Sequence, residues 1–329
     1  MKISFVIPAY NEEHYIGECL DAILKEKRAH SYDVEIIVVN NASTDGTADV
    51  VKKYPKDEVT LVDEPNKGIV RARRAGFLAS TGDLIANVDS DTRITPGWLP
   101  RVMNAFEKDD KLVAFSGPFI YYDAPRKVRV MTHVFYYISY FFYLINRFVL
   151  HVGSMLQGGN FVVRRTALVA IGGYDTNLDF YGEDADVARR LNKVGKVRFT
   201  FKLPAYSSAR RLAKEGGLTM GFRYGINYFW IMFFKKPFTK RYVDVRLENK
   251  NEIVQPAYTV KEWVIAASAV LLFLIIALGA AFVIYSLAET GTVSAVNFIR
   301  LKTQAKTEFT ELSSSTKNML QEKWDENGQ

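Results

Sequence analysis

The chain has 329 residues, of which 48% are hydrophobic, and a formal net charge of +7 at pH 7. This apolar content suffices for one large domain or two smaller ones and excludes disorder throughout the chain. The single cysteine, Cys19, excludes a disulfide framework and a cysteine-ligated zinc site, and it favours a reducing compartment. The positive charge alone leaves nucleic acid, membrane headgroups and anionic substrates open as partners.

The amino-terminal part of the chain alternates between short apolar runs, typical of buried strands, and amphipathic helical stretches. The predicted strands are ISFVIP (3–8), VEIIVVN (34–40), VTLVDEP (59–65) and DLIANVD (83–89). After the first strand, one helical stripe is formed by Ile16, Cys19, Leu20, Ile23 and Leu24. Apolar runs separated by helices predict an α/β domain with a mostly parallel sheet that helices cover on both faces.

Polar residues follow the predicted strands at positions 8–12, 40–45, 63–68 and 89–91. Open parallel sheets bind ligands beyond the carboxyl ends of their strands, so these positions are candidate site residues. Asp89 and Asp91 lie one residue apart at the last of these ends. Taken alone, this pair is compatible with a solvated turn or with a cation site.

The segment VRVMTHVFYYISYFFYLINRFVL (128–150) is rich in aromatic residues, and His133, Asn146 and Arg147 interrupt it. These polar residues make it a poor candidate for a membrane span. Two interpretations remain open. It is either an interfacial helix with its aromatic rings at headgroup depth, or a core helix of the domain.

Residues 206–261 are basic and aromatic, and they lead into WVIAASAVLLFLIIALGAAFVIYSL (263–287), which carries no charge. A bilayer core needs only about 20 apolar residues in a helix, so we predict one transmembrane helix over 262–288. Attraction to anionic lipid explains the basic region, Arg246 included, more simply than nucleic acid does. The one predicted span makes this a single-pass protein. The basic excess before the span predicts a cytoplasmic amino-terminal domain, and the tail at 289–329 would lie across the membrane.

Six sequence blocks occur in a characteristic order: FVIPAYNEE, NNASTDGT, NKGIVRARRAG, GDLIANVDSDT, GGNFVVRR and YGEDADVARRL. They resemble the landmarks of glycosyltransferase family 2, and the match covers about residues 1–200. The resemblance implies an inverting enzyme with the GT-A fold, a Rossmann-like sheet flanked by helices. The catalytic domain would then span 1–205, with a nucleotide-binding half at 1–92 and an acceptor half at 93–205.

The resemblance also implies a divalent cation, Mn²⁺ or Mg²⁺, which neutralises the departing diphosphate. Asp91 would ligate this metal, and Asp89 would contact it or the ribose. The other residues expected at the nucleotide are Pro8, Ala9, Tyr10, Glu12, Asn41, Asp45 and Arg73.

For three of these nucleotide positions a second interpretation is open. Asn41 stands where many members of the family have an aspartate that contacts uracil, so the identity of the base is open. Asp45 would either shape a turn or contact the base. Arg73 could instead lie on a solvated helix face, although that interpretation fits Arg71 and Arg74 better.

By the same resemblance, Asp184 is the base that removes the proton from the acceptor hydroxyl, and Glu183 lies beside it. These acidic residues also have a structural explanation, because a helix start favours negative charge by about 0.3 to 1 kcal/mol. Asp186 is the competing candidate, and its position favours a helix-start role. The backbone at Gly158, Gly159 and Asn160 would approach the donor sugar.

The stretch SSARRLAKEGG departs from the family's processive synthases, which carry Gln-x-x-Arg-Trp at this point. The missing tryptophan and the single predicted span argue against a polymer synthase. Arg210 or Arg211 would still reach the diphosphate.

Together these features predict a membrane-anchored glycosyltransferase that moves a sugar from a nucleotide-sugar, most simply a UDP-sugar, to a membrane-proximal, lipid-linked acceptor. A soluble or protein acceptor is the alternative for a tethered enzyme. A polyprenyl-phosphate sugar synthase and a non-catalytic membrane scaffold remain open as other functions. The Glu-Asp block disfavours a nucleotidyltransferase.

Overall fold

The computed structural model describes residues 1–146, 154–178, 180–239, 244 and 246. One compact unit comprises Met1–Tyr143 and Val152–Thr259. The second unit, Leu144–His151 with Val260–Gln329, lies almost entirely outside the described residues.

The predicted membrane helix at 262–288 and the tail at 289–329 also lie outside the described residues. Among the helices that the structure describes, none combines the length and the apolar character that a bilayer span requires.

A seven-stranded mixed sheet forms the centre of the first unit. In spatial order its strands are β3 (Thr60–Asp63), β2 (Asp33–Asn40), β1 (Lys2–Ala9), β4 (Leu84–Val88), β8 (Asn160–Arg164), β6 (Leu112–Ser116) and β9 (Lys196–Phe199). β8 runs antiparallel to β4 and β6, and the other paired strands are parallel. The predicted α/β class with a mostly parallel sheet is therefore confirmed. A smaller sheet contains β5 (Arg93–Ile94), β10 (Ala205–Ser207) and β7 (Phe119–Tyr121).

Helices cover both faces of the large sheet because successive side chains of a buried strand point in opposite directions. Phe5 of β1 lies in a cluster with Trp98, on the face covered by α1 (Ile16–Ala29) and α4 (Trp98–Lys108). The next residue, Val6, lies in a second cluster with residues of the opposite helices. These helices are α3 (Ile69–Ala79), α6 (Arg165–Ala170) and α7 (Glu183–Leu191). The short α2 (Thr47–Val51) follows β2.

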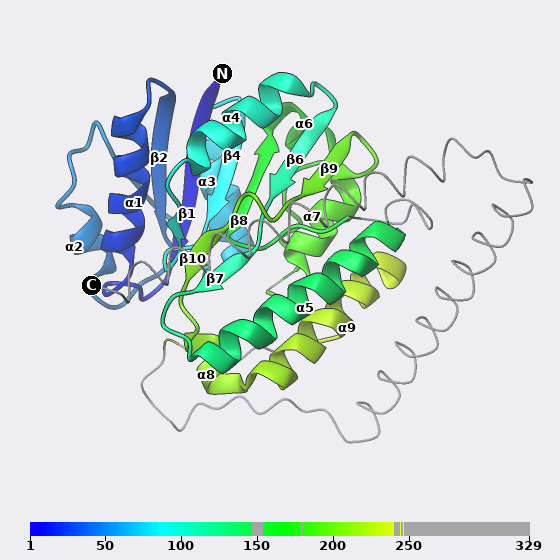
Figure 1. The fold of residues 1–329 in the computed structure, drawn as a ribbon. Coiled ribbons are helices and arrows are strands. Elements are labelled where there is room, and N and C mark those ends of the chain that lie inside the picture. Colours follow the sequence, from blue (N-terminus) through cyan, green and yellow to red (C-terminus); the bar gives the residue numbers. More distant parts are fainter. Residues whose placement is uncertain (147–153, 179, 240–243, 245, 247–329) are drawn as a thin grey trace, which may run out of the picture. The chain divides into compact units, whose positions relative to one another are not determined.

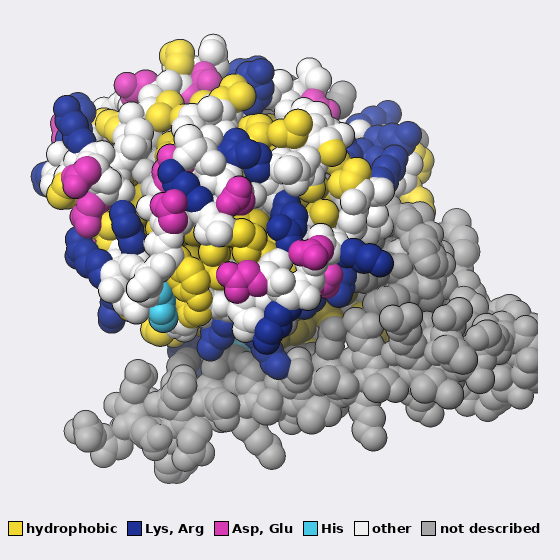
Figure 2. All heavy atoms as spheres, turned by 90° about the horizontal axis from the view of Figure 1, so that it is seen from above, with side chains coloured by type: hydrophobic (Ala, Val, Ile, Leu, Met, Phe, Trp, Pro, Cys, Tyr) yellow, Lys and Arg dark blue, Asp and Glu magenta, His cyan; other side chains and the backbone are white. Residues whose placement is uncertain are grey.

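The order of the strands locates the ligand crevice. From β1 the chain adds β2 and β3 on one side and then returns to add β4 on the other side (Figure 1). The strand order thus reverses between β1 and β4, and such a reversal is where open α/β sheets bind ligands. Figure 2 views the molecule from above, at the amino ends of these strands, where Lys, Arg, Asp and Glu side chains are mixed.

α5 (Arg126–Ile145) and α9 (Gly217–Phe234) lie side by side, with α8 (Arg210–Glu215) preceding α9 (Figure 1). On one face of α5, Tyr136 and Tyr140 are buried against Phe199 of β9. Its other face carries large apolar side chains that are 49–57% exposed, namely Val130, Val134, Ile138 and Phe141. The described part of the segment 128–150 thus combines a core face with an exposed apolar face, and neither predicted interpretation describes it alone.

Candidate active site

An open pocket lies at the carboxyl ends of β1 and β4. Its empty space, open solvent included, is about 470 Å³. Phe180 and Arg246 line it from later parts of the chain. The remaining lining residues lie at or after the carboxyl ends of strands β1 to β4: Pro8, Ala9, Tyr10, Asn41, Lys67, Gly68, Ile69, Asp89 and Ser90. Loops that are distant in sequence therefore meet where the predicted strand ends place them.

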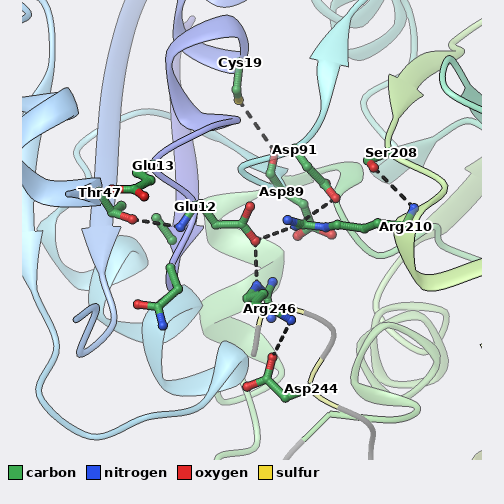
Figure 3. Close-up of polar contacts among 12 residues, drawn as sticks. Glu12, Glu13, Cys19, Thr47, Asp89, Asp91, Ser208, Arg210, Asp244 and Arg246 are labelled. Atoms are coloured by element: carbon green, nitrogen blue, oxygen red, sulfur yellow. Dashed lines mark hydrogen bonds and ion pairs between the residues drawn. The ribbon is translucent and has the colours of Figure 1, made fainter. Parts of the chain in front are cut away.

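Carboxylates and arginines form a cluster beside this pocket (Figure 3). The buried Glu12 accepts hydrogen bonds through one oxygen, Oε1, from Arg210 Nη2 and from Arg246 Nε, both at 2.5 Å. Arg210 also pairs with Asp91 Oδ2 at 3.0 Å. The second oxygen of Glu12, Oε2, is buried and bonds to none of the residues that the structure describes.

The chemistry of this cluster fits a divalent cation. Burial is the main cause that raises the pKa of Asp91 to about 6, and Glu12 and Asp89 add to the rise while Arg210 opposes it. A cation would stabilise the ionised carboxylate, and Glu12 Oε2 shows unused acceptor capacity nearby. The described residues contain no group of three or more metal-ligating side chains. Asp91 and Asp89 are the carboxylates that would hold such an ion, with oxygens of the donor and water as its other ligands.

Arg73 connects the two acidic blocks of the sequence. Its side chain is 1% exposed, and it donates through Nη2 to Asp89 Oδ1 at 3.0 Å and through Nη1 to Glu183 Oε1. Burial would lower the pKa of Arg73, but Glu183 and Asp89 outweigh burial and raise it, so the guanidinium stays charged. Arg71 and Arg74 are exposed, as predicted. Arg73 does not line the pocket, and it acts on the site by holding Asp89.

Glu183 is a buried carboxyl whose stability contribution depends on pH. Burial raises its pKa to about 7, although Arg73 opposes the rise. The unfolded value is about 4.3, so this group contributes stability below that pH, and the contribution is lost as the pH rises through the folded value. We expect the unfolding temperature to fall between about pH 4.5 and pH 7. The fall should be shallower in Glu183→Gln, and an equally steep fall in this variant would contradict the assignment.

Asp184 is held at the start of α7 by main-chain N–H groups. Its Oδ2 accepts from Gly158 N at 3.1 Å, and its Oδ1 accepts from Ala185 N at 2.8 Å. Burial raises its pKa, against the effect of these N–H groups and of Arg73. Asp186, only 4% exposed, has both oxygens committed to arginines of α7, at 2.7 and 2.6 Å. Asp184 is therefore the better placed of the two to accept a proton.

The Gly158-Gly159 turn lies between Asp184 and Asp89. Gly158 N donates to Asp184, and Gly159 O accepts from Asp89 N at 3.3 Å. Gly159 has a φ of +81°, and a Cβ at this position would lie 2.3 Å from Asp89 Oδ2. The turn can approach both carboxylates because its residues have no side chains.

Gly159→Ala is therefore expected to lower stability and activity. Backbone strain alone costs about 1–3 kcal/mol, and the new methyl group would displace Asp89. Gly172→Ala is the matched control, because its φ is +79° but no atom lies within 4 Å of its Cβ. Thermal unfolding and transfer assays compare the two variants. Equal losses would show that the contact with Asp89 is unimportant.

The side chain of Asn41 holds the loop between β3 and α3. It donates to Glu64 O at 3.0 Å and to Asn66 O at 2.8 Å, and it accepts from Gly68 N at 2.7 Å. Both amide donors are therefore used by the pocket wall. Recognition of the base by these donors would require the loop to change, so the expected base contact stays a prediction.

Three further predicted residues have side chains engaged in the fold. Asp45 accepts from the main chain and the hydroxyl of Thr47, which is the turn-shaping alternative. Asn160 is 1% exposed and bonds to a buried indole and to main-chain carbonyl groups. Arg211 pairs with Glu215 at 2.9 Å. Asn160 can meet a sugar only through its backbone unless these bonds break.

Two cations of the pocket were not singled out by the sequence. Lys67 Nζ lies 3.8 Å from the centre of the Tyr10 ring and 3.0 Å from Asp244 Oδ2. It falls within the predicted ligand stretch at 63–68, but nothing distinguished it from its neighbours. Arg246 belongs to the basic region that the sequence predicts to face lipid, and no motif links it to Glu12, 234 residues earlier.

The chain is similar in sequence to proteins that are named as sugar transferases. A Haloferax volcanii protein, glucosyl-dolichyl phosphate glucuronosyltransferase, is 24% identical over 264 residues, which cover 74% of this chain and 78% of that protein. The uncharacterized glycosyltransferase alr2836 of Nostoc sp. is 34% identical over 113 residues, which cover 33% of this chain. That match spans 34% of the Nostoc protein, so only about a third of its length is compared.

The fold is shared with a solved structure, the mannosyltransferase PcManGT from Pyrobaculum calidifontis. Its TM-score is 0.55 at 19% identity, over 94% of this chain and 80% of that one. Residues 4–172, from β1 through α6, match the family model described as Glycosyl transferase family 2. Because this match covers just over half of the 329 residues, the chain belongs to glycosyltransferase family 2.

Proposed function

We propose that this glycosyltransferase moves a sugar from a nucleoside-diphosphate donor to an acceptor hydroxyl, with inversion at the anomeric carbon. One observation carries the proposal: the Gly158-Gly159 turn contacts Asp89 at one residue and Asp184 at the other. An inverting displacement needs stabilisation of the leaving group and a base on opposite sides of the reacting carbon. Asp89 and Asp184 contact successive residues of this turn. One carboxylate can therefore serve the leaving group while the other serves the acceptor hydroxyl.

Different residues would assist the departing diphosphate and the attacking acceptor. A Mn²⁺ or Mg²⁺ ion, when held by Asp91 and Asp89, supplies positive charge for the departing diphosphate. Arg210 stands beside Asp91 and adds a second positive charge there. Asp184 takes the acceptor's proton as the new bond to the anomeric carbon forms and the bond to the diphosphate breaks. Its raised pKa makes it a stronger base than an exposed aspartate.

A UDP-sugar is the donor that we infer from the family resemblance. The Pyrobaculum neighbour was crystallised with GDP-Man and Mn²⁺, so guanine nucleotides are the natural comparison. Titration calorimetry of the full chain with UDP, GDP and ADP in the presence of Mn²⁺ tests this donor class. We expect UDP to bind most tightly and to lose affinity without the metal. Failure of all three nucleotides to bind would overturn the proposed function.

The acceptor that we propose is lipid-linked and close to the membrane. Exposed apolar side chains run along α5, and exposed Arg126 and Lys127 lie at its start. Such a face suits an anionic bilayer surface. The Haloferax relative is named for glucosyl-dolichyl phosphate, a lipid-linked sugar. The predicted helix at 262–288 would keep the domain at the cytoplasmic side of the membrane.

A dye attached to α5 tests this orientation. Cys19 is the only cysteine in the sequence and is buried, so Ile138→Cys can be labelled selectively with a polarity-sensitive dye. We expect a blue shift of its emission in the full chain when anionic vesicles are added. Leu78→Cys on α3 is the control, because Leu78 is 64% exposed and lies on a different helix. Equal responses at the two positions would argue against docking through α5.

A further inference from the structure

Arg246 reaches the donor pocket from a part of the chain that the family match does not include. It lines the pocket together with Tyr10, Asn41 and Asp89, whereas the family model ends at residue 172. Its side chain is 20% exposed, and its Nε donates to Glu12 Oε1 (Figure 3). The site therefore contains a cation that the motifs of the catalytic domain do not supply.

Asp244 determines where the main chain of Arg246 stands. Asp244 Oδ1 accepts from Arg246 N at 3.1 Å, and Asp244 Oδ2 pairs with Lys67 Nζ at 3.0 Å. The main-chain oxygen of Asp244 also accepts from Lys214 Nζ at 3.0 Å. None of these bonds uses the guanidinium of Arg246. The guanidinium can therefore change partners while its main chain stays in place.

Glu12 is a shared partner for two arginines. Arg210 and Arg246 both bond to its Oε1, which brings two positive charges to one oxygen. Arg210 has a second carboxylate partner in Asp91, whereas Glu12 is the one carboxylate recorded for Arg246 among the described residues. An anion that enters the pocket would offer Arg246 additional acceptor oxygens. A planar guanidinium suits phosphate oxygens in particular, because it can donate two parallel hydrogen bonds.

We propose that Arg246 is a donor-binding residue whose guanidinium binds the diphosphate of the nucleotide-sugar. The inference rests on the proposed function, because it requires a nucleoside-diphosphate donor. In this arrangement Lys67, Arg210 and Arg246 place three positive charges around the ends of β1 and β4. The diphosphate would then be held by a residue from outside the matched family region as well as by the metal at Asp91.

Binding measurements that separate phosphate from base recognition test the assignment. UDP and GDP are titrated into the full chain with Mn²⁺ by calorimetry, and uridine and guanosine are followed by ligand-observed NMR. Arg246→Gln is expected to weaken the binding of the preferred diphosphate roughly ten- to hundredfold and to leave its nucleoside unaffected. Arg246→Lys should restore part of the affinity, because it keeps the charge without the fork. Arg74→Gln is the control, since it removes a positive charge from an exposed helix position that does not line the pocket, and it should bind as the wild type does.

Two results would overturn the proposal. Unchanged diphosphate affinity in Arg246→Gln is one of them. The other is an equal weakening of binding for the diphosphate and for its nucleoside, because that result indicates a change of pocket shape. If Arg246→Gln does not fold, the same two comparisons are made with Arg246→Lys. If the wild-type chain binds none of UDP, GDP and ADP, the proposed function fails and the inference fails with it. A normal wild type with an unaffected Arg246→Gln leaves the function intact and removes only the role of Arg246.

Discussion

Asp184→Asn is expected to lower kcat by about 10²- to 10⁴-fold and to leave donor affinity unchanged. The amide cannot take the acceptor's proton, but its oxygen can still accept the hydrogen bond from Gly158 N. The fold and the donor pocket should therefore persist while the chemical step is lost. Steady-state transfer rates, combined with calorimetry of nucleoside-diphosphate binding, separate these two effects.

Asp186→Asn is the matched control on the same helix. It weakens the contacts with Arg189 and Arg190, so it should lower the unfolding temperature and leave the chemical step largely intact. An unchanged kcat in Asp184→Asn would contradict the assignment of the base. That outcome would favour the polyprenyl-phosphate sugar synthase, whose acceptor is an ionised phosphate that needs little base catalysis.

Arg73→Met is expected to cause the largest loss of stability, about 3–5 kcal/mol. The substitution leaves Glu183, which is 6% exposed, and Asp89 without the cation that bridges them. Urea unfolding measures the loss. It should shrink toward acidic pH, because protonation of Glu183 removes the uncompensated charge.

Arg74→Met provides the control for this prediction. Arg74 is the next residue on α3 and is exposed, so its replacement should change the free energy of unfolding by no more than about 0.5 kcal/mol. Similar losses in both variants would show that the bridge between the acidic blocks contributes little. A large loss at Arg73 alone would support the view that this residue ties Asp89 to the start of α7.

The sequence was sufficient for the parts of the site that depend on local pattern. Apolar runs alternating with helices predict the parallel strands, and parallel strands place their carboxyl ends at one edge. Tyr10 and Asp89 meet in the pocket for this reason. The role of Asp184 as the base stays a prediction from the motif resemblance, whereas its position at a helix start agrees with the local acidic pattern.

Other features depend on tertiary contacts that no local pattern reveals. Arg71, Arg73 and Arg74 share one helix, and only packing against the sheet distinguishes the buried Arg73 from the exposed pair. Asn160 follows two glycines and is typical of a turn by residue type, yet it begins β8 and its side chain is buried. Arg246 resembles other basic residues near the predicted span. Its contact with Glu12 exists because the chain returns to the pocket after α9.

We expect the chain to transfer a sugar from a nucleotide donor with the help of a cation at Asp91. The most direct measurement is the release of nucleoside diphosphate from a panel of nucleotide-sugars, with Mn²⁺ and a membrane lipid extract present. We predict release with one donor class in the wild-type protein and a strong reduction in Asp91→Asn. Release that is equal in the two proteins would contradict the metal assignment, and no release with any donor and any extract would contradict the enzymatic function itself.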